Sequence, residues 1–222
     1  MKKPAKKPIE TETAHAPSPP AGKRARARRL APEERKSQIV KSALKVLARR
    51  GIGHTNHTEV AAEAGISLPA VFFYFPTHEM LTEAVLAEVF RYLIDDLVIP
   101  MQGREVPAPL CIENTLLALF DAFTSHPDYA RVWLDWSTAI RDPKTWSSYL
   151  VFHKRACAIF KATIERGKSE GTLNRNLHSA TAARVFVGLG HMVAHMKFSG
   201  SSRAAIARVM RSLVDGYIAS RH

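Results

Sequence analysis

The chain has 222 residues, of which 46% are hydrophobic, and this is enough to bury the core of one large domain or two small ones. Apolar runs stay short of the roughly 20 residues that cross a bilayer, and the start lacks the apolar part of a secretion signal, so we expect a cytoplasmic protein without a membrane partner. The two cysteines, Cys111 and Cys157, lie far apart without metal-ligand spacing, which suits a reducing compartment and predicts two small buried hydrophobes.

The net charge of +12 is concentrated at the start of the chain. Residues 1–29 hold nine Lys or Arg against two Glu, a net charge of +7, and the other 193 residues carry only +5. A basic arm ahead of a near-balanced body favours an anionic polymer or surface as partner, although a solubilising tail explains the charge equally well. Residues 1–22 contain five of the thirteen prolines and no apolar period, which predicts a disordered tail.

From Pro32 onward the apolar spacing is helical and strand-like alternation does not recur, so we predict an all-α fold. A first helix begins at Pro32 and is stopped by Gly51, and a second covers about 58–64. Gly65 then supplies a left-handed residue for a sharp turn, and Ser67 is placed to cap a third helix. Helix, glycine turn and short helix is the arrangement that presents a helix to the DNA major groove.

The third helix, predicted over 68–74, ends in a run of consecutive aromatic residues. In so short a helix we predict that Val71, Phe72 and Phe75 point into the core. Phe73 and Tyr74 are predicted to stay near the outer face.

Later helices are predicted from apolar periods and from the prolines and glycines between them. They cover 78–98, 110–125, 128–140, 144–168, 179–198 and 203–220. The predicted domains are the disordered tail (1–22), a basic arm with a three-helix helix-turn-helix DNA-binding domain (23–77), and a larger helical domain (78–222).

Several motifs resemble the TetR family of bacterial transcription regulators. They are VAAEAGIS at 60–67, FFYF at 72–75 and THEML at 77–81. Within that family, RRGIG (49–53), VFFYFPTHE (71–79), VWLDWS (132–137) with the following RD, and IERG (164–167) are similar to the quorum-sensing master regulators of vibrios, the LuxR and HapR type. The resemblance implies a homodimer of all-helical subunits, in which the larger domain binds an effector and dimerises.

The resemblance also makes double-stranded operator DNA the expected partner, contacted by the third helix and the residues around it. The candidate DNA-binding residues there are Thr55, Asn56, Thr58, Ser67, Leu68, Pro69, Ala70, Phe73, Tyr74, Thr77 and His78. Leu68, Ala70 and Phe73 offer apolar contact to thymine methyls, whereas hydroxyl groups suit phosphates. The vibrio-type regulators carry asparagine at the position of Phe73, so their operator sequence is not carried over.

A second set of DNA contacts is predicted in the basic arm ahead of the first helix. Its members are Arg24, Arg26, Arg28 and Arg29. Alternating arginines resemble the minor-groove arm of the LuxR type, where narrow A·T-rich grooves attract guanidinium groups. A non-specific phosphate tether is the alternative.

The resemblance implies that the last two helices, here 179–198 and 203–220, form the dimer interface. Candidate interface residues come from one apolar stripe on each of these helices. These are Ala183, Val187, Gly190, Ala194, Ile206, Val209, Leu213 and Tyr217. Stripes that pack only within one subunit are the alternative. A pocket for a small hydrophobic effector is predicted from a second set, Phe120, Phe123, Trp133, Trp136, Phe152, His153 and Cys157, with ordinary core packing as the alternative.

No catalytic constellation is found, and neither a cofactor nor a metal is expected. Gly167-Lys168-Ser169 ends like a phosphate loop, but Ala162 stands where the earlier glycine is required. His191 and His195 lie one turn apart, but they lack both the glutamate of an HExxH motif and a third ligand.

The sequence therefore favours a homodimeric, sequence-specific transcription regulator. Its biological role is predicted to be that of the quorum-sensing type, with a drug- or metabolite-responsive repressor of a neighbouring gene as the alternative. The alternative from a different class is a non-specific basic protein that binds nucleic acid or an anionic surface.

Overall fold

The computed structural model describes residues 30–218. The chain divides into two units, Met1–Ala31 and Pro32–His222, and all the described helices belong to the second. The predicted tail and the four arginines of the basic arm, Arg24, Arg26, Arg28 and Arg29, lie outside the described residues.

The all-α prediction is confirmed, since the described residues form helices and no strand. The α-helices are α1 (Pro32–Arg50), α2 (His57–Ala64), α3 (Leu68–Tyr74), α4 (His78–Phe90), α5 (Ala108–Ser125), α6 (Pro127–Ser137), α7 (Pro143–Glu170), α8 (Ser179–Phe198) and α9 (Arg203–Leu213). A π-helical segment, Arg91–Val98, continues α4, and another, Val214–Ile218, continues α9. Short 3-10 turns occupy Ile52–His54 and Ile99–Met101. The sixth helix ends at Ser137 rather than at the predicted residue 140.

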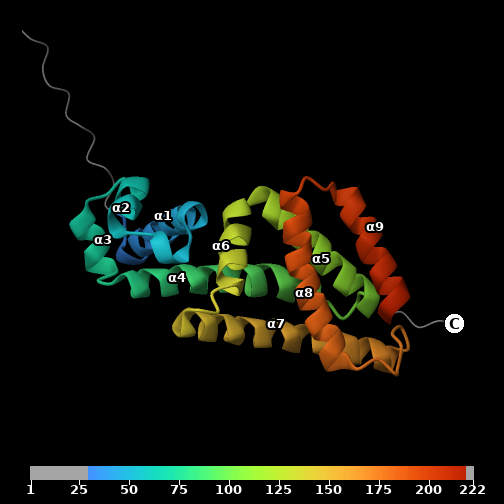
Figure 1. Cartoon of the computed structure of the whole chain (residues 1–222). Coiled ribbons are helices and arrows are strands. Elements are labelled where there is room, and N and C mark those ends of the chain that lie inside the picture. Colours follow the sequence, from blue (N-terminus) through green and yellow to red (C-terminus); the bar gives the residue numbers. More distant parts are fainter. Residues whose placement is uncertain (1–29, 219–222) are drawn as a thin grey trace, which may run out of the picture. The chain divides into compact units, whose positions relative to one another are not determined.

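The first three helices gather at one end of the helical unit, and α4 runs from them toward α8 and α9 (Figure 1). Gly65 has a φ of 64° and closes α2 in the left-handed conformation, as predicted. The side chain of Asn56 accepts a hydrogen bond from the Glu59 N–H and begins α2, and Thr77 does the same for α4. Gln38 of α1 donates to the Ala64 carbonyl at 2.9 Å, which secures the end of α2 against α1.

The third helix is held by a histidine that sequence reasoning did not single out. Nε2 of His57 donates to the Phe75 carbonyl at 2.7 Å, and the His57 ring stacks on Phe72 with centroids 4.4 Å apart. Phe72 was predicted to point into the core, but this stacking keeps it at the surface with 45% exposure. Val71 and Phe75 are buried as predicted.

The larger part of the unit is built around α5, α7 and α8. Helix α8 packs against both α5 and α7, and α9 packs against α5. At the end of α7, a Cβ atom on Gly167 would lie 2.6 Å from side-chain atoms of Ala108 and Leu173, so this approach to α5 requires glycine. A continuous hydrophobic core runs from α1 to Ile218. The predicted domain boundary at residue 77 stays a prediction.

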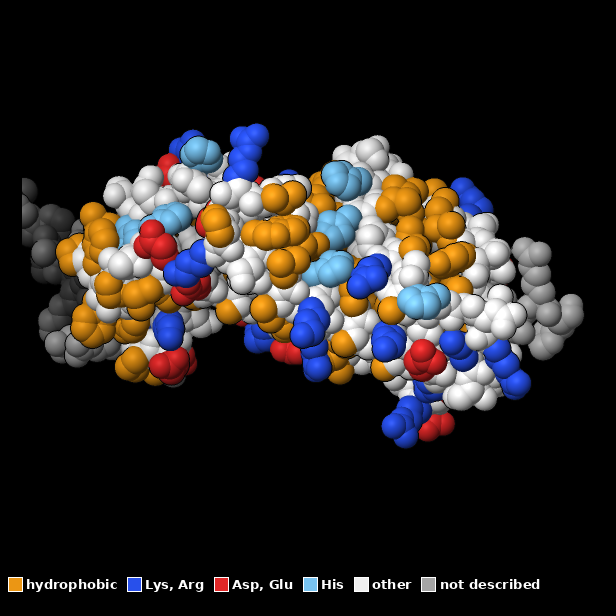
Figure 2. All heavy atoms as spheres, turned by 60° about the horizontal axis from the view of Figure 1, so that its bottom comes forward, with side chains coloured by type: hydrophobic (Ala, Val, Ile, Leu, Met, Phe, Trp, Pro, Cys, Tyr) orange, Lys and Arg blue, Asp and Glu red, His pale blue; other side chains and the backbone are white. Residues whose placement is uncertain are grey.

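Hydrophobic side chains remain on the surface in several separate patches (Figure 2), with exposed members on α3, α4, α7, α8 and α9. None of the helices within residues 30–218 is long and apolar enough to cross a membrane.

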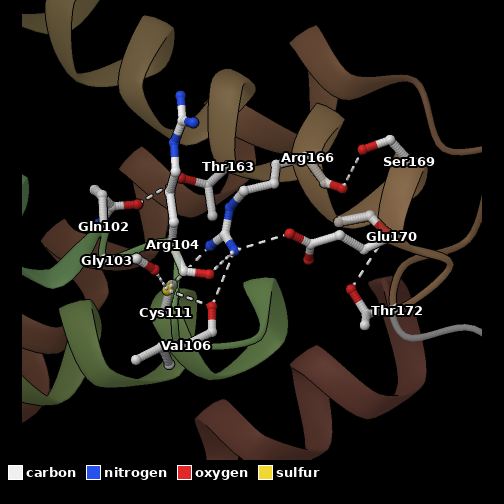
Figure 3. Close-up of polar contacts among 11 residues, drawn as sticks. Gln102, Gly103, Arg104, Val106, Cys111, Thr163, Arg166, Ser169, Glu170 and Thr172 are labelled. Carbon is white, nitrogen blue, oxygen red and sulfur yellow. Dashed lines mark hydrogen bonds and ion pairs between the residues drawn. The ribbon is translucent and has the colours of Figure 1, made fainter.

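Two residues of α7, Thr163 and Arg166, fasten the connection between α4 and α5 (Figure 3), and the Thr163 hydroxyl donates to the Gln102 side-chain oxygen. The Arg166 guanidinium donates to the Val106 carbonyl at 3.0 Å and to the Arg104 carbonyl at 3.3 Å. It also contacts the Cys111 sulfur at 3.3 Å and pairs with Glu170 at 3.1 Å. These bonds satisfy backbone carbonyls in a segment that has no regular ladder of its own.

The two cysteines differ in environment. Cys111 is fully buried, as predicted, whereas the prediction for Cys157 is wrong, because this residue is only half-buried on α7. Its sulfur lies 3.7 Å from Nδ1 of His153, one turn earlier on the same helix. Burial raises the pKa of the Cys157 thiol and lowers the pKa of the His153 imidazole.

Candidate nucleic-acid interface and internal cavity

The helix-turn-helix leaves the outer face of α3 uncovered. Phe73 has an exposed fraction of 80%, and the edge of Tyr74 packs against its ring at 5.1 Å between centroids. Ser67 and Pro69 are exposed, while Leu68, Ala70 and Tyr74 are half-buried. The structure therefore brings the predicted residues of α3 together on one short helix, with Phe73 projecting furthest into solvent.

The predicted phosphate contacts beside α3 have mixed environments. Asn56, Thr58 and Thr77 are exposed. Thr55 is buried, and its hydroxyl donates to the Gly51 carbonyl at 3.2 Å, so it is not free to bind a phosphate. His78 is half-buried, with Nε2 buried and without a hydrogen-bond partner among the described residues.

The helix-turn-helix is tied to the rest of the unit through α6. The Ile52 backbone N–H, just after α1, donates to a carboxylate oxygen of Asp135 at 2.7 Å. Gly51 has a φ of 89°, a conformation that favours glycine and that turns the chain toward this carboxylate. Asp135 lies within the VWLDWS motif, but the motif alone gave no indication of a partner 83 residues earlier.

A small apolar cavity of about 30 Å³ lies between α5, α6, α7, α8 and the π-helical segment Arg91–Val98. Its lining comprises Leu93, Ile94, Val98, Leu119, Trp133, Phe152, Ala156, Phe160, Phe186, Val187 and Gly190. Trp133 and Phe152 are thus the two predicted pocket residues that reach it. This volume exceeds the ~10–15 Å³ that one water needs, but it is far below the ~300 Å³ typical of small-molecule sites.

The other predicted pocket residues do not line this cavity. Phe120, Phe123 and Trp136 are buried in the core, where the Trp136 indole N–H donates to the Thr145 carbonyl at 3.0 Å. His153 and Cys157 are half-buried on α7. The predicted role of these five residues in binding an effector stays a prediction.

Trp133 has the chemistry expected of a ligand contact. Its indole nitrogen is buried and has no hydrogen-bond partner among the described residues. The ring lies against that of His191, tilted by 31°, with the centroids 4.1 Å apart. Burial lowers the pKa of His191, whose Nδ1 donates to the Val187 carbonyl and whose Nε2 lies 3.3 Å from the Tyr149 hydroxyl. Trp133 therefore combines a place in the cavity wall with a buried donor that has no partner among the described residues.

The helix-turn-helix segment, residues 39–85, matches the family model described as "Bacterial regulatory proteins, tetR family". The HTH-type transcriptional regulator LuxR of Vibrio harveyi is 28% identical over 194 residues, which are 86% of this chain and 90% of that protein. The HTH-type transcriptional regulator EthR of Mycobacterium tuberculosis is 25% identical over 219 residues, 96% of this chain and 97% of that protein.

Residues 39–85 thus form a helix-turn-helix domain of the tetR family of bacterial regulatory proteins. A putative transcriptional regulator from Saccharomonospora viridis, solved in complex with choline, has the same fold with a TM-score of 0.70 and 20% identity, covering 85% of this chain and 100% of that one. A domain of this family is typical of bacterial regulatory proteins, and the relatives that match most of the chain's length are named as transcriptional regulators.

The residues predicted for a TetR-type dimer interface fall into two groups. Five of them are buried within the subunit, namely Ala183, Val187, Gly190, Ala194 and Ile206. The four of these that lie on α8 form a ridge of mostly small residues, which we call the small-residue ridge. It faces α5, α6 and α7, and its glycine, Gly190, lets Trp133 and Leu119 approach closely. Val209, Leu213 and Tyr217 remain exposed on the outer face of α9 and its π-helical continuation.

Proposed function

We propose that this TetR-family regulator acts as a homodimer in the cytoplasm, binds a specific operator sequence, and releases it when a small hydrophobic effector occupies the larger helical domain. The uncovered face of α3 carries the proposal, because it is the element that a helix-turn-helix places in the major groove. Two such helices in a symmetric dimer contact half-sites about one helical turn, ~34 Å, apart.

The exposed stripe on α8 and α9 supports the homodimer. Val185 on α8 and Val209, Leu213 and Tyr217 along α9 are large hydrophobic side chains left in contact with solvent. Half-buried Leu189, Met192 and Met196 continue the stripe along α8. We propose this outer face, rather than the buried ridge, as the surface that a second copy covers.

A pair of variants tests the dimer. Leu213→Glu places a charge in the proposed interface, and Val151→Glu places the same charge at an exposed hydrophobic position on α7. Light scattering should report monomers for Leu213→Glu and dimers for Val151→Glu and for the unaltered protein. Dimers in both variants would remove α9 from the interface.

The cavity beside Trp133 supports effector binding. It is apolar, it lies in the larger domain, and one residue of its wall, Trp133, has a buried indole N–H without a hydrogen-bond partner among the described residues. Because about 30 Å³ is too small for an effector, we propose that Trp133 and the π-helical segment move apart when one binds. The choline complex of the Saccharomonospora viridis protein supports the use of this fold for small molecules.

Sequence preference is the decisive test of the function. The full chain and a chain lacking residues 1–29 are each titrated at moderate salt with duplexes selected from a random pool and with unselected duplexes. The proposal expects a selected sequence to bind better in both cases, with weaker overall binding by the shortened chain. Equal binding to all duplexes, abolished by the deletion, would support a non-specific basic protein instead.

Similarity to LuxR of Vibrio harveyi supports a cell-density regulator within this function. Genome-wide occupancy by chromatin immunoprecipitation, at low and high cell density, tests this assignment. Many occupied promoters that change with density would support it. Occupancy of a single neighbouring promoter, independent of density, would support a drug- or metabolite-responsive repressor.

A further inference from the structure

The exposed surface of α3 is apolar between its two hydroxyl-bearing ends, Ser67 and Tyr74. The helix, LPAVFFY, contains no arginine, lysine, amide or acidic side chain, and these are the groups that distinguish bases through paired hydrogen bonds in the major groove. A single hydroxyl accepts or donates to several bases and selects poorly among them. Direct readout by this helix is therefore restricted to apolar contact, and the apolar group on the edge of a base pair is the thymine methyl.

Phe73 is the side chain placed to make that contact. Its exposed fraction of 80% is the highest among the large hydrophobic side chains of residues 30–218. Phe72 is held back by its stack on His57, and Val71 and Phe75 are buried, so the other apolar side chains of the aromatic run are committed to the fold.

The position of Phe73 is also defined rather than loose. The edge of Tyr74 packs against its ring at an interplanar angle of 87°. The bond from His57 to the Phe75 carbonyl secures the end of the same helix. The backbone that carries Phe73 is thus anchored at the end of the helix, while its ring stays free to meet a partner.

Resting on the proposed operator-binding function, we propose that Phe73 selects the operator by covering a thymine methyl group in each half-site. The occupant of this exposed aromatic surface is the major groove of DNA, because residues 1–29, immediately ahead of the helical unit, carry a net charge of +7 that attracts phosphates. The position under Phe73 is then an A·T pair in every high-affinity half-site.

Deoxyuridine substitution tests the contact, because this base lacks only the thymine methyl. Operators are first selected from a random duplex pool with the full chain, and each thymine of the selected duplex is then replaced in turn. We expect one position per half-site at which the replacement weakens binding about four-fold, and roughly 15-fold when both half-sites are changed.

Two variants at residue 73 separate this contact from others. Phe73→Ala should bind the thymine and deoxyuridine duplexes equally, and its far-UV dichroism should match that of the unaltered protein, since the ring is 80% exposed. Phe73→Asn should shift the selected base to adenine, which asparagine recognises through N6 and N7. The control Val151→Ala, at an exposed hydrophobic position on α7, should keep the full deoxyuridine effect.

The outcomes distinguish the proposed role of Phe73 from the proposed operator-binding function on which it rests. A selection that enriches no sequence contradicts the proposed function. An enriched sequence that is insensitive to deoxyuridine at every thymine overturns the role of Phe73 and leaves the function standing. A deoxyuridine effect that persists in Phe73→Ala also overturns it, since another residue would then cover the methyl.

Discussion

Adding one methyl group to the wall of the cavity tests whether Trp133 can move. In Gly190→Ala, the new Cβ atom would lie 3.2 Å from Cη2 of Trp133 and 3.5 Å from Cδ1 of Leu119. The first distance is short, so the indole must shift by a few tenths of an ångström. The cavity of about 30 Å³ beside it provides the space.

The expected change in stability follows from two favourable contributions. Replacing glycine by alanine within a helix stabilises the helix by about 1 kcal/mol. Burying the added methyl contributes about 0.8 kcal/mol more if the indole shifts freely. If the ring cannot shift, overpacking costs ~1–3 kcal/mol and reverses the sign.

Gly188→Ala in the same helix is the matched control. Gly188 is exposed, and a Cβ atom there would meet nothing within 4 Å in its own subunit, so within the subunit this variant reports the helix contribution. Thermal unfolding of the two variants, at a protein concentration where light scattering shows the same oligomer, should place Gly190→Ala at or above Gly188→Ala. Each 1 kcal/mol corresponds to ~2–4 °C in a protein of this size.

A Gly190→Ala protein that is less stable than the unaltered chain, beside a stabilised Gly188→Ala, would refute the reasoning. It would mean that Trp133 is fixed, and a fixed indole leaves a cavity too small for any effector.

Three further predictions concern the contacts that position the DNA-binding part. Asp135→Ala removes the acceptor of the Ile52 N–H, so chemical denaturation should show a free energy of unfolding about 1 kcal/mol lower. The effect of an effector on DNA binding should also be weaker than in the unaltered protein. His57→Phe keeps a ring beside Phe72 but leaves the Phe75 carbonyl unpaired, so operator affinity should fall while the helix content by circular dichroism stays constant. The half-buried His191 has a lowered pKa, so the unfolded chain takes up its proton first on acidification. Stability is therefore complete above about pH 6.5 and declines as the pH falls below that value, and urea titrations should show a smaller decline in His191→Gln.

The helical framework was predictable because the signals that set helix ends are local. The bounds of α3 and α8 coincide with those predicted, and Gly65 has the predicted left-handed conformation. Thr77, directly before α4, likewise caps that helix with its side chain. Such signals depend on residues within one turn of each other, and a single sequence displays them directly.

Side-chain partners far along the chain were not predictable in this way. Phe72 belongs to an aromatic run whose members look equivalent in sequence, and only the stack on His57 makes it different. The small-residue ridge of α8 has the spacing of a close helix contact, but the spacing does not say whether the contacting helix is in the same subunit. Thr55 is buried because its hydroxyl bonds to the Gly51 carbonyl in a turn, and the next residue of that turn, Ile52, bonds to the distant Asp135.

Helix α6 connects the proposed effector cavity to the DNA-binding part through residues on opposite faces. Trp133 and Asp135 are two positions apart, which at 3.6 residues per turn separates their side chains by about 200° around the helix axis. One side lines the cavity, and the other accepts the Ile52 N–H at the end of α1. A helix is stiff over this distance, so a displacement of α6 that enlarges the cavity also moves the Asp135 carboxylate. The turn at Gly51 must follow or lose its hydrogen bond, and either response alters the placement of α2 and α3 relative to DNA. A rotation of Trp133 about its own side-chain bonds would enlarge the cavity without this effect, and the effector response of Asp135→Ala separates the two cases.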